Sequence, residues 1–406
     1  MGPMELEARY SAANYHPLPV VLRSGQGAYL WDVEGRRYID MMSAYSAVSH
    51  GHSHPRIVNA LTDQARRLAV PSRAFHSDTL GPFLAKLCQV TGLDAALPMN
   101  TGAEAVETAI KAARRWGYRV KGIAPDRAEI IVAEGNFHGR TTTIVGFSSE
   151  PDYRDGFGPF APGFVPVPFG DLDAVRRAIT GNTAAVLIEP IQGEAGIIVP
   201  QEGYLSGLRQ ICDDANVLLI FDEVQSGLGR TGKWFAFQHE NAKPDGLVLG
   251  KALGGGVLPV SAFVATHAVM DVFTPGSHGS TFGGNALAAA VGLEALSVLE
   301  DEGLIERSRI LGEHMLARLR AMKRPGLKAA RGRGLWVGAE IDPAFASARE
   351  VCVCLMAKRV LSKETHDTVV RLAPPLVIAR EDLDWALDRF EDVLRELELH
   401  RHPVAA

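Results

Sequence analysis

The sequence predicts an α/β protein, with a large domain whose mostly parallel sheet lies between helices and a smaller α+β domain. Short apolar runs such as those at 129–133 and 217–222 lack polar alternation, as strands buried on both faces do. Helical patterns separate these runs along the chain, which favours parallel pairing. The chain has 406 residues, 47% of them hydrophobic, so it can bury a sizeable core.

The first 45 residues contain short strand-like pieces, such as residues 27–33. Beyond them, helix and strand patterns alternate for about two hundred residues. The first predicted helix places Val106, Ile110 and Ala113 on one face. The pattern predicts helices at 103–118 and 204–215, and strands at 129–133, 184–189, 217–222 and 246–250.

The C-terminal part reads as a separate α+β unit. Two long helical patterns lead into it, and a Gly-rich strand and two more helices follow. The predicted helices lie at 283–303, 305–322, 347–358 and 381–399, and the strand lies at 331–341. We therefore expect an N-terminal segment (1–45) that packs with the small domain, a large domain (46–285) and a C-terminal small domain (286–406).

Composition excludes several classes of protein. The net charge is −5 with both signs mixed along the chain, whereas a nucleic-acid binder usually shows a basic face. No apolar run reaches the roughly 18 residues that cross a bilayer, and the first residues resemble neither a secretory signal nor a transit peptide. Four cysteines are too few for a disulfide scaffold. We therefore expect a cytoplasmic protein.

A glycine-rich segment, Gly227-Leu-Gly-Arg-Thr-Gly232, matches the spacing of a dinucleotide-binding loop. That loop must open a helix, and the residues after Gly232 show no clear helical pattern. The same segment nearly forms a P-loop, but Trp234 stands where a Ser or Thr must bind magnesium. A nucleotide site at this segment is the less favoured interpretation.

Two further patterns have a metal-binding and a structural interpretation. His50, His52 and His54 would share one face of a strand, as metal ligands can, but no Cys or carboxylate completes a set nearby. A polar turn is favoured there. Cys352 and Cys354 lie in a helical pattern, where residues two apart do not share a face. Two core cysteines are favoured for this pair, and no metal site is expected.

Three signals are more informative in combination than singly. Asp222 ends a buried strand, where a carboxylate is costly unless paired, although a capping Asp remains possible. Lys251 follows another strand and precedes three glycines, so it is either a solvated lysine or a desolvated Schiff-base amine. The segment 101–104 begins a helix, as a cap or as a phosphate cradle. A lysine, an acid and a phosphate cradle together suit a phosphorylated pyridine aldehyde.

At this point the sequence resembles the class-III pyridoxal-phosphate-dependent aminotransferases of fold type I. Residues 219–232 read Leu-Ile-Phe-Asp-Glu-Val-Gln-Ser-Gly-Leu-Gly-Arg-Thr-Gly, and Pro244-Asp245 and Gly250-Lys251 follow, as in that family's signature. The other matching segments are 14–19, 100–105, 136–141, 189–196, 278–284 and 370–375. Within the family the resemblance is greatest to ornithine δ-aminotransferases, on Tyr-His-Pro-Leu-Pro and Ser43-Ala-Tyr-Ser-Ala-Val48.

The resemblance implies a role for each matching residue at a pyridoxal 5'-phosphate site. Lys251 would form the Schiff base and carry the proton, and Asp222 would keep the pyridine nitrogen protonated. Gln225 would contact the ring oxygen, and Phe137 would stack on the ring. Gly102 and Ala103 would donate N–H groups to the phosphate, and Ser280 and Thr281 would reach the phosphate of the neighbouring subunit, which implies a homodimer.

The resemblance also implies the substrates. The expected reaction moves the δ-amino group of ornithine to 2-oxoglutarate, giving glutamate 5-semialdehyde and glutamate. Tyr15 would bind the α-amine, and Arg140 the carboxylate as a fork. Arg371 would take the second carboxylate of 2-oxoglutarate and be neutralised by Glu194 during the ornithine half-reaction, because a guanidinium cannot deprotonate. Tyr45 would line the pocket.

Alternatives remain at this stage. N-acetylornithine and 4-aminobutyrate are rival amine donors on the same scaffold. His138 follows Phe137 where some ornithine enzymes carry an aromatic residue, and acetylornithine enzymes also show His there. Tyr15 separates the donors, because an acetylated or absent α-amine needs no such partner. A catalytically inactive scaffold protein is the alternative from another class, and the complete residue set opposes it.

Overall fold

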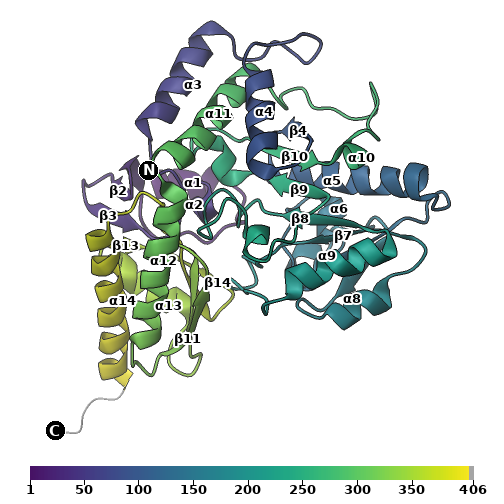
Figure 1. Ribbon diagram of the computed structural model, residues 1–406. Helices are drawn as coiled ribbons and strands as arrows, with labels where there is room; N and C mark the ends of the chain where they lie inside the picture. Colours follow the sequence, from purple (N-terminus) through teal and green to yellow (C-terminus); the bar gives the residue numbers. More distant parts are fainter. Residues whose placement is uncertain (402–406) are drawn as a thin grey trace.

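The computed structural model describes residues 1–401 and is built around one seven-stranded sheet (Figure 1). The strand order is β4-β10-β9-β8-β7-β5-β6. The strands are β4 (Ala95–Met99), β5 (Glu129–Ala133), β6 (Phe164–Val167), β7 (Thr183–Ile188), β8 (Leu218–Asp222), β9 (Gly246–Leu249) and β10 (Ser261–Ala265). β5 to β9 pair in parallel, and β10 runs antiparallel to both of its neighbours.

Successive side chains of these strands enter two different cores, as the period of two in a strand requires. Ile130, Val132 and Ile220 pack with helix α5 (Gly102–Trp116) on one face. Ile131 and Leu219 pack on the other face, where α8 (Leu172–Ala178) and α9 (Tyr204–Ala215) lie. With both faces covered, the strands can be apolar throughout, which explains the unbroken apolar runs in the sequence.

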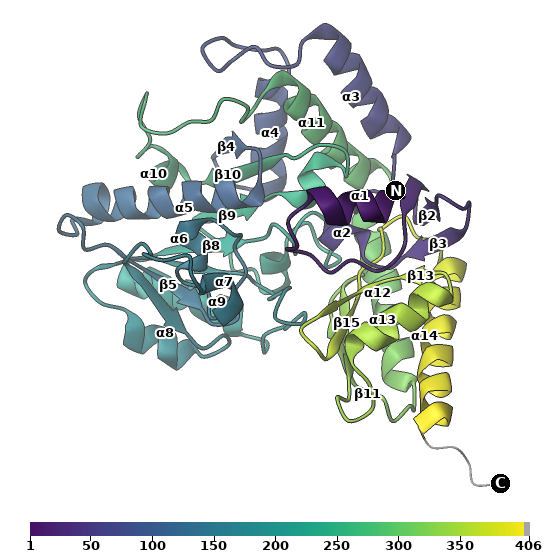
Figure 2. The ribbon, with the colours of Figure 1, turned by 180° about the vertical axis from the view of Figure 1, so that it is seen from behind.

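The N-terminal and C-terminal parts of the chain share a second region, seen from behind in Figure 2. One sheet has the order β1-β2-β3-β13, and the other β11-β12-β15-β14. β3 pairs in parallel with β13, with Ile39 opposite Val360. The elements are β1 (Leu22–Gln26), β2 (Tyr29–Asp32), β3 (Arg37–Asp40), β11 (Leu327–Gly332), β12 (Val337–Ile341), β13 (Val360–Leu361), β14 (Lys363–Thr365), β15 (Val369–Leu372), α12 (Leu304–Ala321), α13 (Ala348–Ala357) and α14 (Arg380–Arg401).

Further helices cover the edge of the large sheet or connect its strands. α11 (Ala286–Asp301) packs against α3 (Pro55–Arg67) and α4 (Leu80–Thr91) beside β4 and β10. The remaining helices are short: α1 (Pro3–Tyr10), α2 (Ser43–Ser46), α6 (Thr142–Val145), α7 (Pro151–Arg154), α10 (His267–Met270), the π-turn Gly117–Lys121, and the 3₁₀ turns Ala236–His239 and Lys251–Gly254.

The α/β class and most predicted elements are confirmed, and one strand is wrong. The predicted single strand at 331–341 is a hairpin, because Gly332 and Gly334 turn the chain back between β11 and β12. Gly334 has φ +61°, and a Cβ there would lie 2.5 Å from a backbone oxygen. The domain division 1–45, 46–285 and 286–406 stays a prediction, and its last residues, 402–406, lie outside the described residues.

The glycine-rich segment 227–232 forms a packed junction between distant parts of the chain. Arg230 is fully buried, and its guanidinium donates to the carbonyl oxygens of Leu335 (2.9 Å) and Pro374 (2.7 Å) and to the hydroxyls of Ser43 (3.0 Å) and Ser49 (2.9 Å). The glycines of this segment therefore have a structural explanation, since the chain must approach these neighbours closely. A Cβ on the last of them would lie 2.8 Å from the backbone of α12.

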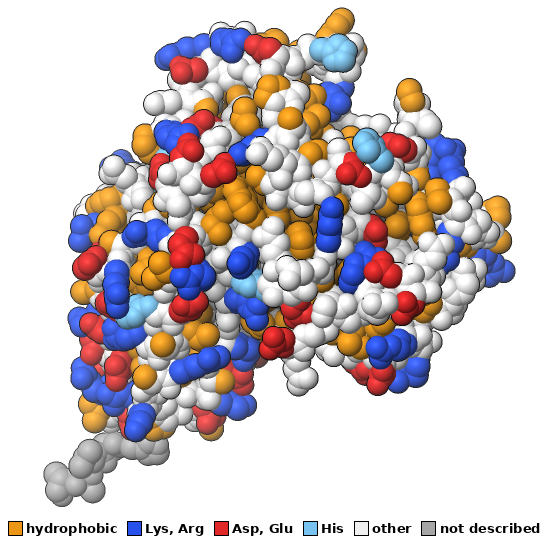
Figure 3. Space-filling model, in the orientation of Figure 1, with side chains coloured by type: hydrophobic (Ala, Val, Ile, Leu, Met, Phe, Trp, Pro, Cys, Tyr) orange, Lys and Arg blue, Asp and Glu red, His pale blue; other side chains and the backbone are white. Residues whose placement is uncertain are grey.

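The other motifs also have structural partners. His50, His52 and His54 contact Ala295, Asp40 and Glu302 respectively, each at a different place. Among residues 1–401, no cluster of three or more potential metal ligands occurs, and no helix is both long and apolar enough to cross a membrane. Figure 3 shows acidic and basic side chains intermixed over one face, in line with the charge pattern of the sequence.

Candidate active site

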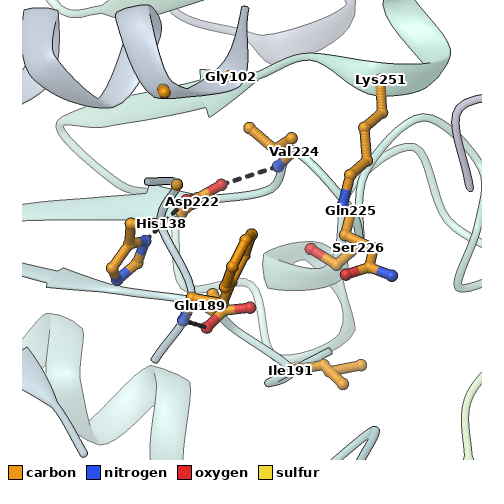
Figure 4. Close-up of a pocket in the computed structure, with 12 residues that line it drawn as sticks. Gly102, His138, Glu189, Ile191, Asp222, Val224, Gln225, Ser226 and Lys251 are labelled. Carbon is orange, nitrogen blue, oxygen red and sulfur yellow. Dashed lines mark hydrogen bonds and ion pairs between the residues drawn. The ribbon is translucent and has the colours of Figure 1, made fainter. Parts of the chain in front are cut away.

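A cavity of about 190 Å³ opens at the carboxyl ends of the parallel strands, the edge of an α/β sheet where ligands bind. Asp222 ends β8, and Lys251 follows β9. Figure 4 shows Lys251 pointing into the cavity toward Gln225, with Asp222 between His138 and the backbone of Val224. The lining residues are Gly102, Ala103, Phe137, His138, Gly139, Glu189, Ile191, Asp222, Val224, Gln225, Ser226 and Lys251.

Asp222 is a buried carboxylate with two partners. Its Oδ2 lies 2.7 Å from Nδ1 of His138, and its Oδ1 accepts a hydrogen bond from the backbone N–H of Val224 at 3.0 Å. Burial opposes a charge on His138, but the hydrogen bond and the charge of Asp222 outweigh it and raise the pKa of the imidazole. His138 and Asp222 therefore form a buried hydrogen-bonded pair at the wall of the cavity.

Glu189 is a second buried carboxylate, placed just after β7. It accepts hydrogen bonds from the backbone N–H groups of Phe137 (2.9 Å) and Gly193 (3.3 Å). Burial raises the pKa of Glu189 to about 7, while His138 and the two N–H groups oppose this shift. Glu189 thus fastens the loop that carries Phe137 and His138 to the end of the sheet.

Lys251 is the amine of the cavity. It follows Gly250 directly and adopts φ +45°, a left-handed conformation that is uncommon outside glycine. Burial, followed by the charge of Arg371, lowers the pKa of Lys251, although Glu194 and Asp222 oppose this. A lysine with a lowered pKa has a larger neutral fraction and is a better nucleophile.

The N-terminus of α5 forms the opposite wall. Thr101 caps the helix by accepting from the N–H of Glu104 at 3.3 Å. The N–H groups of Gly102 and Ala103 have no hydrogen-bond acceptor among residues 1–401 and line the cavity. A Cβ on Gly102 would lie 3.1 Å from Val224, so the wall is closely fitted. Two free N–H groups at the start of a 15-residue helix suit a phosphate.

A second group of side chains joins the C-terminal region to this cavity. Arg371, on β15, forms a two-pronged ion pair with Glu194, with Nη1 2.8 Å from Oε1. Burial alone would raise the pKa of Glu194, but Arg371 outweighs it and holds that pKa below its usual value. The Arg371 guanidinium also lies 5.1 Å from the ring centre of Tyr45. A carboxylate is thus paired with a buried arginine at this site.

Arg140 is exposed and lies over an aromatic ring. Its guanidinium carbon is 3.9 Å from the ring centre of Tyr153 and 5.5 Å from that of Phe137. Arg140 forms no ion pair within residues 1–401. It is therefore a cation held by aromatic contact, available to an anion entering the cavity.

The structure brings most of the predicted residues together but separates three of them. Ser280 and Thr281 do not line the cavity. Ser280 instead accepts a hydrogen bond from Asn100 at 3.0 Å, and Thr281 lies beside a different small hollow near Phe75. Tyr15 is 82% exposed, on a segment without regular structure.

Sequence reasoning missed the roles of three residues. Glu189 follows β7 as Asp222 follows β8, so the rule that identified Asp222 could have found Glu189. His138 was noted only as a departure from a family pattern, and nothing in its local sequence indicates that it contacts Asp222, 84 residues away. Tyr153 lies on α7, and its contact with Arg140 likewise depends on the tertiary structure.

Comparisons with known proteins agree with this geometry. The sequence profile of the family "aminotransferase class-III" matches residues 10–394. An ornithine aminotransferase of Brevibacillus brevis is 55% identical over 395 residues, which is 97% of this chain and 98% of that protein. An ornithine aminotransferase structure from Toxoplasma gondii, with PLP at partial occupancy in its active site, has a TM-score of 0.96 and 44% identity, covering 98% of this chain and 94% of that one.

A third similar protein is named for a different amine donor, acetylornithine. The structure of an acetylornithine aminotransferase from Elizabethkingia anophelis has a TM-score of 0.88 and 46% sequence identity, covering 97% of this chain and 98% of that one.

Proposed function

Because the chain belongs to the class-III aminotransferases, we propose that it transfers the δ-amino group of L-ornithine to 2-oxoglutarate, giving L-glutamate 5-semialdehyde and L-glutamate. The observation that carries this proposal is the arrangement of one lysine, one buried carboxylate and one free helix N-terminus around a single cavity. Full-length identity of 55% to an ornithine aminotransferase supports the amine donor.

The enzyme depends on pyridoxal 5'-phosphate, as its family does. When bound, the cofactor supplies an aldehyde that condenses with amines and a ring that accepts an electron pair. The cavity fits such a group in its chemistry, because it offers a nucleophilic amine, an anion for a ring nitrogen and free N–H groups for a phosphate. Lys251, Asp222, Gln225 and Phe137 would hold the ring, and Gly102 with Ala103 the phosphate.

Each residue then has a defined task. The amine of Lys251 would accept the proton from the δ-carbon of ornithine and would return a proton to the amino-acceptor substrate in the second half-reaction. Asp222, held in place by its hydrogen bond to His138, would hold a proton at the pyridine nitrogen when the cofactor is bound. Glu189 fixes the loop of Phe137 and His138 and so keeps both rings in place.

Substrate orientation follows from the two arginines. Arg140 would bind the α-carboxylate of ornithine, and Tyr15 its α-amine, while Tyr45 limits the width of the pocket. Glu194 would neutralise Arg371 during this half-reaction and release it to the second carboxylate of 2-oxoglutarate. An ion pair at the site that can open accommodates both substrates with one set of residues.

We also propose that the active unit is a homodimer in the cytoplasm. Ser280 and Thr281 lie outside this chain's own cavity, as residues that serve a neighbouring subunit would. Phe75 and Phe282, near Thr281, are 71% and 56% exposed and would gain from burial. The four cysteines are unpaired, which suits a reducing compartment. Light scattering of the purified protein tests the dimer.

Transfer from N-acetylornithine is the second candidate, because an acetylornithine aminotransferase is 46% identical over nearly the whole chain. The two functions differ at the α-nitrogen. Free ornithine needs a hydrogen-bonding partner such as Tyr15 for its α-ammonium, whereas the acetylated donor does not.

A panel of amine donors with 2-oxoglutarate tests the function. We expect the highest kcat/KM with ornithine, followed by N-acetylornithine and 4-aminobutyrate, with semialdehyde and glutamate formed in equal amounts. A higher kcat/KM with N-acetylornithine would refute the proposal. Lys251→Ala should lose at least about a hundredfold in kcat, since proton transfer by a positioned residue contributes that much. Lys243→Ala, at an exposed lysine, is the matched control.

A further inference from the structure

The segment that carries Tyr15 has few contacts with the rest of the protein. Residues 11–19 form no helix or strand, and all of them except Leu18 are exposed. Tyr15 forms no hydrogen bond within residues 1–401, and 82% of its side chain is exposed. A side chain in this position has no fixed location unless the backbone beside it is held.

Arg349 holds that backbone. Its Nη1 donates to the carbonyl oxygen of His16 at 3.1 Å, and its Nη2 donates to the carbonyl oxygen of Pro17 at 3.3 Å. The two terminal nitrogens of one guanidinium thus hydrogen-bond to the backbone of the two residues that follow Tyr15. Within residues 1–401, these are the only hydrogen bonds that join segment 11–19 to residues distant in the sequence. The other two are local, from the N–H of Ser11 to Glu7 and from the N–H of Val20 to Leu18.

The position of Arg349 in its own helix is electrostatically unfavourable. Arg349 is the second residue of α13, and a cation in the first helical turn is opposed by the helix dipole. Glu364 compensates, with its Oε1 3.0 Å from Nη1 of Arg349. An arginine at this place is therefore explained by its contacts outside the helix and not by helix stability.

The same contacts reach the second group of site residues. Glu364 lies on β14 next to Thr365, whose hydroxyl donates to the carbonyl oxygen of Glu194. Tyr15 and Glu364 are both close enough to Tyr45 to add to the rise in its pKa, which is caused mainly by burial. Segment 11–19 is thus linked to Glu364 through Arg349, and the backbone of Glu194 is hydrogen-bonded to Thr365, the next residue of β14.

We propose that Arg349 is a positioning residue for substrate selection, which holds the segment of Tyr15 beside Tyr45. This inference rests on the proposed function, because it assumes that Tyr15 binds the α-amine of ornithine. Without Arg349 the segment is loose, and Tyr15 must be ordered again each time ornithine binds. The loss therefore falls on the KM for ornithine, while kcat is retained.

Donors that lack the α-amine provide the internal comparison. 4-Aminobutyrate has no group for Tyr15, so its kcat/KM should not depend on Arg349. The preference for ornithine over 4-aminobutyrate is therefore the quantity that reports on this contact, and general damage to the enzyme would lower both values together.

The experiment uses the holoenzyme with Arg349→Met, Arg349→Lys, Tyr15→Phe and the double variant Arg349→Met with Tyr15→Phe. We expect Arg349→Met to raise the KM for ornithine about three- to tenfold, the value of one lost hydrogen bond, with 4-aminobutyrate unchanged within about twofold. Arg349→Lys keeps its charge beside Glu364 but replaces the two separated guanidinium nitrogens with a single nitrogen, so it should show part of the effect. In the Tyr15→Phe background, Arg349→Met should add nothing further.

Limited digestion with chymotrypsin gives a second readout that needs no activity. Loss of the tether should raise the initial rate of cleavage after Tyr15 several-fold in Arg349→Met. Arg320→Met is the control, because exposed Arg320 also donates to a backbone carbonyl, that of Ala330, away from the site. It should change neither readout.

The two proposals fail in different ways. The proposed role of Arg349 is wrong if Arg349→Met is cleaved at the parent's rate, or if this variant turns over ornithine and 4-aminobutyrate with equally reduced kcat/KM. Either result leaves the ornithine aminotransferase function intact. If the parent enzyme prefers N-acetylornithine, the proposed function is wrong, and cleavage after Tyr15 still decides whether Arg349 holds the segment.

Discussion

Two arginines beside the cavity are held in different ways, and this decides which of them is free. Arg371 is 3% exposed and faces the Glu194 carboxylate with two nitrogens. Arg140 is exposed, and its guanidinium lies over the aromatic ring of Tyr153. We therefore expect an entering carboxylate to meet Arg140 first, and to reach Arg371 only by displacing Glu194.

This difference predicts the behaviour of Glu194→Gln. The variant removes the charge but keeps the shape, so Arg371 loses its counter-ion. We expect the KM for 2-oxoglutarate to fall and the KM for ornithine to rise, each by roughly tenfold, because an uncompensated cation attracts the dicarboxylate and repels the diamine. Steady-state kinetics with each substrate measure this. Glu313→Gln, at an exposed ion pair, is the control. An unchanged KM for 2-oxoglutarate would contradict the switch.

The buried carboxyl of Glu189 predicts a pH dependence of stability. Its pKa is raised from 4.5 to about 7, so its contribution to stability is complete below about pH 4.5 and is lost as the pH rises through 7. The loss is roughly 3 kcal/mol at most. In Glu189→Gln this contribution does not titrate. The difference in thermal midpoint between variant and parent should therefore grow in the variant's favour from pH 5 to pH 8, and parallel curves would exclude the effect.

Residue types at strand ends could be read from the sequence, but their partners could not. Asp222 and Lys251 were predictable because each follows an apolar run. The contact of His138 with Asp222 depends on how two loops meet at the sheet edge, which no local pattern encodes. The roles of all these residues in catalysis stay predictions.

At the scale of elements, the turn that carries Tyr45 is unusual. Ser43, Ala44, Tyr45 and Ser46 all have positive φ, at 43°, 46°, 58° and 73°. Each non-glycine residue in this conformation costs about 1–2 kcal/mol. Asp40 accepts from the N–H of Ser43 at 2.8 Å, which helps to hold the turn. The backbone strain is thus located at the turn that positions Tyr45, the residue expected to line the substrate pocket.

Substitutions at Ala44 test this strain, because its side chain is exposed and adds no packing. Ala44→Gly should stay within about 1 kcal/mol of the parent, since glycine loses the strain but costs backbone entropy. Ala44→Val should lower the free energy of unfolding by about 1–2 kcal/mol, because β-branched residues fit this conformation worst. Denaturant titrations measure both. The explanation fails if valine is tolerated as well as glycine.

The sequence predicted elements well where periodicity was long and failed where turns decide. α9 was predicted at its observed bounds, and β5, β8 and β9 within a residue. The hairpin at 327–341 was read as one strand because its turn lies within a run of glycines. β4 and β10 were missed because their alanine-rich sequences, Ala-Ala-Leu-Pro-Met and Ser-Ala-Phe-Val-Ala, lack the unbroken run of large apolar residues that marks β5 and β8.

At the scale of the whole molecule, one guanidinium joins three parts of the chain. Arg230 lies on the loop after β8, and its partners lie near residues 43–49, 335 and 374. Among the described residues no carboxylate forms an ion pair with it, and burial lowers the pKa of Arg230 to about 9. Four neutral oxygens therefore replace the water that the cation would bind.

Arg230→Met should be strongly destabilising, by about 3–5 kcal/mol, since it leaves buried carbonyl groups without donors. Ser49→Ala removes one acceptor of Arg230 and one donor to the carbonyl oxygen of Ser46, and should cost only about 1–2 kcal/mol. Thermal unfolding of both variants distinguishes this junction from ordinary packing. A cost for Arg230→Met no greater than for Ser49→Ala would show that the guanidinium has no special role.

The parallel pairing of β3 with β13 has a consequence for synthesis of the chain. Ile39 leaves the ribosome more than three hundred residues before its partner Val360, a delay of roughly tens of seconds at cellular translation rates. The last strand of the seven-stranded sheet to be synthesised, β10, ends at Ala265, so this sheet can assemble during that interval. The edge of β3 that β13 later covers is open during that interval, and an unpaired strand edge can pair with a strand of another chain.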